Sequence, residues 1–325
     1  MKNISLDLVR VTEAGAIHAS KWVGSGNKEL ADKDASQAMR DRFNQMDFCG
    51  LIKIGEGKKD KSFGLYEGEI VGKASYTADF MTEATRKLYR HLQGHTVCDI
   101  AIDPIEGTTP TVYGGPEAMS VVAIANKDSM YTTENYYMDK LVWGPTTNKF
   151  KIKPSLRYSI KKNIQILSEA LDKPYDRVII CVLDRVRNLD RIEKLRKLGV
   201  RLKLIKDCDV SGGIAACLNR SGVDCYMGIG GSPEGVITAA AVKGLGGGME
   251  IRDVTKDGER WFTKTGSIVA LNKLIDGGCA FSATGITTGS ILDGVKIING
   301  KYVTHSMFMR SESKTVRWLR TEHGN

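Results

Sequence analysis

The sequence predicts an α/β protein, because short apolar runs alternate with segments of helical periodicity. Residues 177–183, 201–205 and 223–229 read as strands, and 190–198 and 236–242 read as helices between and after them. Polar loops follow several of these runs directly. The chain of 325 residues contains no internal repeat and no sharp change in composition. We therefore expect one large domain or two closely associated subdomains, with a soft boundary near residue 160.

The remaining elements follow from the same patterns. Apolar residues in roughly helical spacing predict helices over 6–22 and 30–46, separated by glycines at 24 and 26. Helices are also expected over 79–92 and 164–171. Short apolar or alternating runs predict strands over 51–54, 99–103 and 120–125.

Composition places the chain among ordinary soluble globular proteins, with 42% hydrophobic and 26% charged residues. No apolar run is long enough to span a bilayer, and the N-terminus lacks the apolar segment of a signal peptide. The seven cysteines are scattered, with no Cys-x-x-Cys pair. This spacing argues against a zinc site or a disulfide framework, so we expect a protein of the reducing cytoplasm.

The formal charge of +9 and the pI of about 9.1 make a nucleic-acid partner worth testing. The basic residues are spread out, however, and their short runs at 58–61 and 161–162 carry no interleaved aromatic residues. An anionic small molecule accounts for the charge equally well. We expect neither a nucleic-acid partner nor a membrane.

The most informative stretch is residues 98–109, where apolar and acidic residues alternate up to an Asp-Pro pair. Proline cannot continue a strand ladder, so the strand is expected to end at Asp103. Asp103, Glu106 and Thr108 then crowd one turn. Closely packed carboxylates repel each other unless a cation lies between them, and a hard divalent metal suits oxygen ligands. The alternative is a solvated acidic turn at the end of a strand.

Other polar loops follow the expected strands, at 55–60, 184–187 and 207–209. In open α/β sheets ligands bind beyond the carboxyl ends of strands, so these loops are expected to converge. Arg185 and Arg187 suit a phosphate but are equally ordinary surface charges. Asp207 and Asp209 are either turn residues or ligands of sugar hydroxyls.

The turn at 230–235 places glycine amides and a helix start beside Glu234, which suits an oxyanion or a metal-bound phosphate. Ordinary helix-start chemistry explains it as well. The turn lacks the Lys-Ser/Thr ending of a P-loop, so an ATP site is excluded. The histidines show no ligand spacing, and no Gly-x-Ser-x-Gly elbow indicates a serine nucleophile. Carboxylates, arginines and a phosphate-friendly turn together indicate metal-assisted phosphate hydrolysis.

With these residues in place, the chain resembles the class II fructose-1,6-bisphosphatases of the GlpX type, within the lithium-sensitive phosphatase superfamily. The resemblance extends in order from near residue 8 to near residue 318. The matching strings are Leu8-Val9-Arg10-Val11-Thr12-Glu13-Ala14, Asn27-Lys28-Glu29-Leu30-Ala31-Asp32, Ile54-Gly55-Glu56-Gly57-Lys58-Lys59-Asp60, Asp103-Pro104-Ile105-Glu106-Gly107-Thr108-Thr109, Tyr137-Met138-Asp139-Lys140-Leu141, Val182-Leu183-Asp184-Arg185, Gly230-Gly231-Ser232-Pro233-Glu234-Gly235, Ala283-Thr284-Gly285-Ile286-Thr287 and Met309-Arg310-Ser311.

The resemblance implies a layered α-β-α-β-α sandwich that forms dimers or tetramers. Residues 1–160 would form a metal-binding half and 161–325 a substrate-binding half, both contributing to one active site. The implied metal ligands, for Mn²⁺ or Mg²⁺, are Asp32, Glu56, Asp103, Glu106 and Glu234. The implied catalytic residues are Asp60 and Thr108, which activate water, and Lys28, near the scissile phosphate. The implied substrate-binding residues are Glu106, Gly107, Thr108, Tyr137, Arg185, Val186, Arg187, Asp207, Cys208, Asp209 and Gly231.

The implied reaction is removal of the 1-phosphate of fructose 1,6-bisphosphate, giving fructose 6-phosphate in gluconeogenesis. A dual enzyme that also accepts sedoheptulose 1,7-bisphosphate is the nearest alternative. The chain departs from the family pattern at Lys58, where an acidic residue is usual, and at 74–96, which reads as a helical insertion. Lysine near the metals favours a more anionic ligand or a weaker metal site. A sugar-phosphate-binding protein with weakened catalysis is therefore a further alternative.

Overall fold

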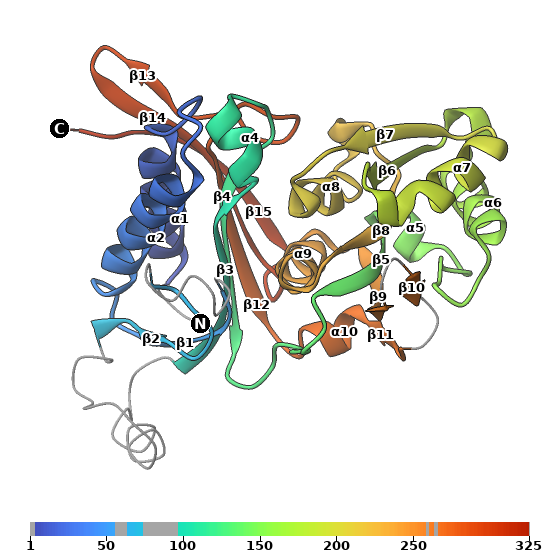
Figure 1. Ribbon diagram of the computed structural model, residues 1–325. Helices are drawn as coiled ribbons and strands as arrows, with labels where there is room; N and C mark the ends of the chain where they lie inside the picture. The colour runs from blue at the N-terminus through green and yellow to red at the C-terminus, as the bar shows by residue number, and fades with distance from the viewer. Residues whose placement is uncertain (1–3, 56–63, 74–96, 258–259, 263–265, 325) are drawn as a thin grey trace. The chain divides into compact units, whose positions relative to one another are not determined.

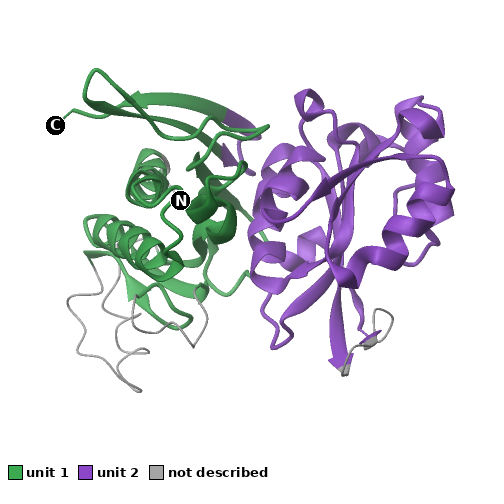
Figure 2. Cartoon of the chain, turned by 45° about the horizontal axis from the view of Figure 1, so that its top comes forward, with its two compact units in different colours: residues 1–130, 276–308, 317–325 green, residues 131–275, 309–316 purple. Residues whose placement is uncertain are grey.

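The computed structural model describes residues 4–55, 64–73, 97–257, 260–262 and 266–324. The chain forms two compact units (Figure 2). Unit 1 comprises residues 1–130, 276–308 and 317–325, and unit 2 comprises residues 131–275 and 309–316. The metal-binding and substrate-binding halves expected on either side of residue 160 stay a prediction.

The first sheet has the strand order β13-β14-β12-β4-β3-β1-β2, with β15 paired to β14. Its strands are β1 (Cys49–Ile54), β2 (Ile70–Val71), β3 (Val97–Glu106), β4 (Met119–Asn126), β12 (Cys279–Gly285), β13 (Lys296–Ile298), β14 (Lys301–Arg310) and β15 (Thr315–Glu322). Strands β1 and β3 pair in parallel, whereas the pairs β1–β2, β3–β4 and β4–β12 are antiparallel. The helices of this unit are α1 (Ser5–Ser20), α2 (Lys28–Phe43) and α4 (Thr108–Tyr113).

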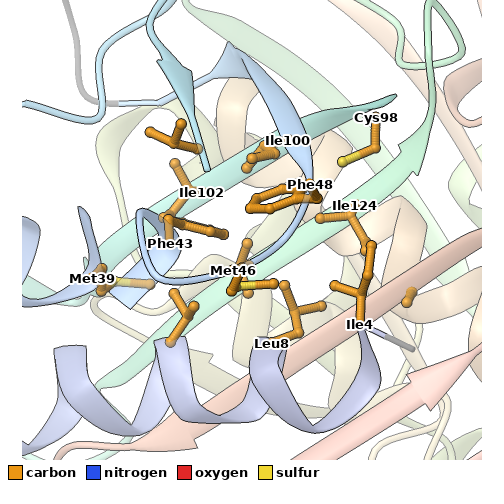
Figure 3. Close-up of a cluster of buried hydrophobic side chains, with 14 of the residues drawn as sticks. Ile4, Leu8, Met39, Phe43, Met46, Phe48, Cys98, Ile100, Ile102 and Ile124 are labelled. Atoms are coloured by element: carbon orange, nitrogen blue, oxygen red, sulfur yellow. The ribbon is translucent and has the colours of Figure 1, made fainter. Parts of the chain in front are cut away.

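Helices α1 and α2 pack side by side against the first sheet (Figure 1). The apolar face of each helix meets β3 and β4 in one core (Figure 3). Leu8, Met39, Phe43, Ile100 and Ile124 are all essentially inaccessible to solvent there. Burying a side chain of this size contributes about 1.5–3 kcal/mol to folding. This core fixes α2 on the sheet, and α2 carries Lys28 and Asp32.

The second sheet has the order β10-β9-β5-β8-β6-β7, with β11 paired to β9. Its strands are β5 (Tyr137–Trp143), β6 (Ile179–Leu183), β7 (Arg201–Ile205), β8 (Cys225–Gly231), β9 (Gly248–Asp257), β10 (Arg260–Phe262) and β11 (Ile268–Ala270). Its helices are α5 (Pro145–Lys149), α6 (Ile160–Leu171), α7 (Leu189–Lys197), α8 (Asp209–Ala215), α9 (Ser232–Leu245) and α10 (Leu271–Leu274). Short 3₁₀ turns lie at Tyr175–Arg177, Val186–Asn188 and Asn219–Ser221.

Helices cover both faces of the second sheet. On one face, Ile164 of α6 and Ile192 of α7 pack with Leu141 and Met227. On the other face, glycines of α8 and α9 approach Tyr226 and Met138. Strand residues alternate between the two faces, so the two sets belong to opposite sides. Strands β6, β7 and β8 are mutually parallel, which places their carboxyl ends at one edge.

The α/β class predicted from the sequence is confirmed, as two mixed sheets with packed helices. Several boundaries differ. The helix expected over 30–46 begins at Lys28, because the Asn27 side chain accepts the Leu30 amide as an N-cap, and it ends at Phe43. Residues 175–177 form a 3₁₀ turn, so the strand expected from 177 begins at Ile179. The helix expected over 79–92 lies outside the described residues.

The expected end of the acidic strand at Asp103 was wrong. Strand β3 continues through Pro104 to Glu106. Asp99, an acidic residue of the alternating run, is fully buried and accepts the amides of Ser129 and Met130. Across the described residues, no helix combines the length and apolar character needed to cross a membrane.

Candidate active site

A β-bulge in β3 shapes the acidic turn of unit 1. Asp103 pairs with Val121 of β4, and Glu106 pairs with Met119, so three steps on β3 match two on β4. Val121 and Met119 lie on the same face of the sheet because side chains alternate along a strand. Asp103 and Glu106 therefore also share a face, although residues three apart in a regular strand would not.

The side chains of this turn support the bulge. Asp103 Oδ1 accepts the backbone amide of Ile105 at 3.0 Å, and Pro104 has no amide to satisfy. Gly107 then adopts the left-handed conformation, with φ 97° and ψ 52°, and directs the chain into α4. Glu106 is buried and Asp103 half-buried.

The start of α2 lies against the start of α4. The Thr108 hydroxyl donates to Asp32 Oδ1 at 3.1 Å, and Lys28 Nζ donates to Thr109 Oγ1 at 2.8 Å. The loop before α2 is itself tied to α4, since the amides of residues 24 and 26 donate to carbonyls of residues 111 and 112. Four predicted site residues of unit 1, Lys28, Asp32, Glu106 and Thr108, are thus held on elements joined by hydrogen bonds.

The loops after β6, β7 and β8 meet at one edge of the second sheet, as expected from their parallel order. Strand β5 begins at this same edge, because Tyr137 pairs with Gly231 at the end of β8. The predicted substrate-binding residues of unit 2 all lie along it, namely Tyr137, Arg185, Val186, Arg187, Asp207, Cys208, Asp209 and Gly231.

Specific contacts hold these loops together. Arg187 Nε donates to the Ile229 carbonyl at 2.8 Å, and buried Asn188 exchanges hydrogen bonds with both the amide and the carbonyl of Ile229. Arg185 lies 3.6 Å from Asp207 Oδ2 in a half-exposed ion pair. Cys208 adopts the left-handed conformation, with φ 64°, which is unusual for a residue other than glycine.

Two further residues, Lys140 and Trp261, are functional candidates that the sequence did not predict. Lys140 is buried and pairs with Asp209, with Nζ 2.5 Å from Oδ2. Trp261 packs edge-on against the Tyr137 ring, at a centroid distance of 5.0 Å. The Arg187 guanidinium lies 4.9 Å from the centroid of the same Tyr137 ring. A lysine in the middle of an apolar strand was the available signal for Lys140, whereas nothing in the sequence pairs Trp261 with Tyr137.

Comparison with known proteins decides the family. The sequence model of the bacterial, glpX-encoded fructose-1,6-bisphosphatases matches residues 2–323. The chain belongs to this family.

Relatives within the bisphosphatase family align with the chain along nearly its whole length. A protein of Thermosynechococcus vestitus named D-fructose 1,6-bisphosphatase class 2/sedoheptulose 1,7-bisphosphatase is 36% identical, covering 98% of this chain and 95% of the relative. Proteins of the same name from Crocosphaera subtropica and Synechococcus elongatus are also 36% identical, with 98% and 99% of this chain covered and 96% of each relative.

This family normally needs a divalent metal, and the carboxylates of the chain suit one. All five expected ligands offer oxygen, the donor that hard divalent cations prefer. Burial raises the pKa of Glu234, an effect that the charge of Lys140 opposes. Within the described part of the chain, Glu234 Oε2 is buried and has no hydrogen-bond partner. A buried carboxylate oxygen is costly unless something pairs with it, so an oxygen that no protein group satisfies is suited to bind a cation.

The full ligand set of this bisphosphatase stays a prediction. Glu56 and Asp60 lie outside the described residues, as does Lys58. Asp32, Asp103 and Glu106 belong to unit 1 and Glu234 to unit 2. In the portions of the chain that the structure describes, no group of three or more His, Cys, Asp or Glu side chains is placed to hold a metal ion.

Proposed function

We propose that the protein hydrolyses the 1-phosphate of fructose 1,6-bisphosphate to fructose 6-phosphate and inorganic phosphate, with Mn²⁺ or Mg²⁺. The observation that carries this proposal is the family match over residues 2–323. The relatives' names and the polar edge of the second sheet are in keeping with it. Such a reaction belongs to gluconeogenesis.

Asp32, Glu56, Asp103, Glu106 and Glu234 are the residues that would hold the metal. When bound, a divalent ion neutralises ester oxygens and lowers the pKa of a water ligand. The bulge in β3 supports two of these assignments, because it gives Asp103 and Glu106 a common face.

Thr108 would orient the attacking water by accepting a hydrogen bond from it. Its single hydroxyl hydrogen has two acceptors within the protein, Asp32 Oδ1 at 3.1 Å and the Ile105 carbonyl at 3.3 Å. Whichever acceptor takes the hydrogen, the oxygen lone pairs remain to receive a water O–H. Thr108 therefore positions the water, and the proton passes to a carboxylate, for which Asp60 is the candidate.

The remaining residues would bind the substrate. Lys28, fixed by Thr109, supplies a positive charge for the scissile phosphate. Arg185 and Arg187 supply guanidinium groups for the phosphate that is retained. Asp207 and Asp209 would accept hydrogen bonds from sugar hydroxyls, and Tyr137 would pack against the sugar.

A dual specificity is the second candidate, because relatives at 36% identity carry both activities in their names. Sedoheptulose 1,7-bisphosphate differs from the fructose ester by one hydroxymethylene. Side-by-side kcat/KM values for the two esters separate the candidates. A binding protein with weak catalysis, suggested by Lys58, predicts tight binding without turnover and activity gained by Lys58→Glu.

The decisive experiment is a phosphate-release assay over sugar bisphosphates with Mg²⁺, Mn²⁺ or no metal. We expect release from fructose 1,6-bisphosphate with either ion and none after treatment with EDTA. Asp60→Ala and Glu234→Ala should each lower kcat by about 10²–10⁴-fold. Exposed Asp176 provides a control, since Asp176→Ala should leave kcat unchanged. No release from any sugar bisphosphate with either metal would refute the proposal.

Three further expectations stay predictions: a cytoplasmic location, a dimer or tetramer, and the absence of a nucleic-acid partner. Sedimentation and gel-shift measurements test the last two. A nucleic-acid complex would show affinity that falls steeply with salt.

A further inference from the structure

Lys140 is a buried cation in the centre of the second sheet. Its strand, β5, lies between β8 and β9, and its side chain is 1% exposed. Burying an ammonium group is costly unless an anion and hydrogen bonds compensate for the lost water. A hydrophobic residue at this position would fill the sheet at lower cost, so the charge itself requires an explanation.

The anion is Asp209, the first residue of α8. Lys140 Nζ donates to Asp209 Oδ2 at 2.5 Å, and the Asp209 side chain is only 8% exposed. Asp209 follows Asp207 and Cys208 in the loop after β7, at the edge where the predicted substrate residues lie. The contact therefore ties the middle of the sheet to this loop.

Two glycines make room for the Lys140–Asp209 pair beneath the turn after β8. A Cβ on Gly230 would overlap Asp209 Oδ2 and would lie 3.1 Å from Lys140 Nζ. A Cβ on Gly235 would lie 3.2 Å from Lys140 Cε and 3.6 Å from Nζ. Close packing over the ion pair thus explains Gly230 and Gly235, whereas a Cβ on Gly231 would overlap the carboxyl group of Glu234.

We propose that Lys140 is a positioning residue of the sugar-bisphosphate site, which fixes the Asp209 carboxylate under the 230–235 turn so that the 207–209 loop is shaped for the sugar. This inference rests on the proposed function, because that function gives Asp209 its substrate. Lys140 itself touches no reacting atom. Its effect on substrate binding passes through Asp209.

A purely structural ion pair on the same strand provides a matched control. Asp139, the neighbour of Lys140, points to the opposite face and pairs with Arg191 of α7 at 2.6 Å. That pair is also largely buried, with side chains 6% and 16% exposed. Arg191→Met leaves one buried carboxylate without its cation, as Lys140→Met does, but away from the 207–209 loop.

The test is a double-mutant cycle on the full-length protein, read from the KM for fructose 1,6-bisphosphate and the Kd for fructose 6-phosphate. Lys140→Met and Asp209→Asn should each raise both constants by about tenfold. The double variant should match Asp209→Asn alone rather than show a hundredfold rise, because Lys140 acts on the sugar only through Asp209 and has nothing left to position once Asp209 is changed. Arg191→Met should lower thermal stability comparably and leave both constants unchanged.

Several results would overturn the proposal. One is a folded Lys140→Met protein with unchanged constants, and another is multiplicative effects in the double variant. Lys140→Met can be tested in a second way if it does not fold alone, because the double variant Lys140→Met/Asp209→Asn removes both charges of the pair. A KM or Kd higher in this double variant than in Asp209→Asn alone would refute the proposal. If no Lys140 variant folds while Arg191→Met does, the role is structural. A wild-type protein that neither hydrolyses nor binds these sugars refutes the proposed function instead.

Discussion

The Thr108 hydroxyl donates to Asp32 Oδ1 at 3.1 Å, so two residues 76 positions apart connect the start of α4 to α2. The contact orients a hydroxyl and a carboxylate relative to each other at the acidic turn. It also limits what Thr108 can do, since a hydroxyl whose hydrogen is directed at the protein serves as an acceptor.

Removal of this hydroxyl should reduce turnover with little change in folding. Thr108→Val keeps the branched shape but loses the oxygen, and we expect kcat to fall by about 10²–10³-fold with KM nearly unchanged. Thr108→Ser retains the oxygen and should keep most of the activity. The measurement is steady-state phosphate release, with thermal unfolding as a check on stability. Equal loss in the serine and valine variants would contradict the assignment.

Gly107→Ala should lower both stability and turnover. A Cβ is unfavourable at φ 97°, and the strain costs about 1–2 kcal/mol. Because Gly107 directs the chain into α4, the strain also displaces Thr108 from Asp32. Gly114, at the other end of α4, has φ 71° and open space around it. Gly114→Ala should therefore cost similar stability, measured by urea unfolding, with unchanged kcat. A Gly107→Ala enzyme of normal kcat would contradict the prediction.

Local chemistry was predictable from the sequence at the acidic turn, but its geometry was not. The string from Asp103 to Thr108 indicated polar residues at the end of a strand, and Glu106 is the last residue of β3. Proline normally ends a ladder, so the sequence predicted that the strand stops at Asp103. The bulge that carries β3 past Pro104 depends on pairing with β4, a contact that no local pattern contains.

Long-range contacts explain the other differences. Asp99 is buried within the alternating strand, and its carboxylate is satisfied by the amides of residues 129 and 130, a contact that the local pattern does not contain. The alternating pattern predicted strand ends with converging loops, and the loops after β6, β7 and β8 do meet at one edge of the second sheet. The loop at 55–60 belongs to unit 1, so its convergence with them stays a prediction. The pairing of Lys140 with Asp209 joins positions 69 apart, so sequence alone could not identify it.

Trp261 should support substrate binding through Tyr137. The Tyr137 ring meets the Trp261 ring at 82° and carries the Arg187 guanidinium over its face. Aromatic pairs of this geometry contribute about 0.5–1.5 kcal/mol beyond area burial. Trp261→Ala should raise the KM for fructose 1,6-bisphosphate by about three- to tenfold, while Trp261→Phe preserves most of the contact. Trp318, which packs near His305 in unit 1, is the control. An equal rise in KM for Trp318→Ala would contradict a specific role.

The buried thiols should make the protein less stable at alkaline pH. All seven cysteines are free and buried, and burial raises the pKa of Cys217 from 9.0 to about 12. Below pH 9 the thiol is protonated in both the folded and the unfolded chain. Between pH 9 and 12 only the unfolded chain ionises, so this thiol should reduce the free energy of unfolding by about 1.4 kcal/mol per pH unit.

Cys217→Ala isolates this effect. The cavity left by the missing thiol changes the free energy of unfolding equally at every pH, so it does not alter the slope of that free energy with pH. We expect the free energy of unfolding of the variant to fall less steeply with pH between pH 9.5 and 11, by the slope that corresponds to about one proton. The measurement is urea unfolding at fixed ionic strength. Labelling with a thiol reagent gives a second measurement. The folded protein at pH 8 should hold Cys217 about a thousandfold less ionised than the unfolded chain, with correspondingly slow reaction. Rapid labelling of Cys217 in the folded protein, or an unchanged slope in the variant, would show that this thiol is not shielded as the structure indicates.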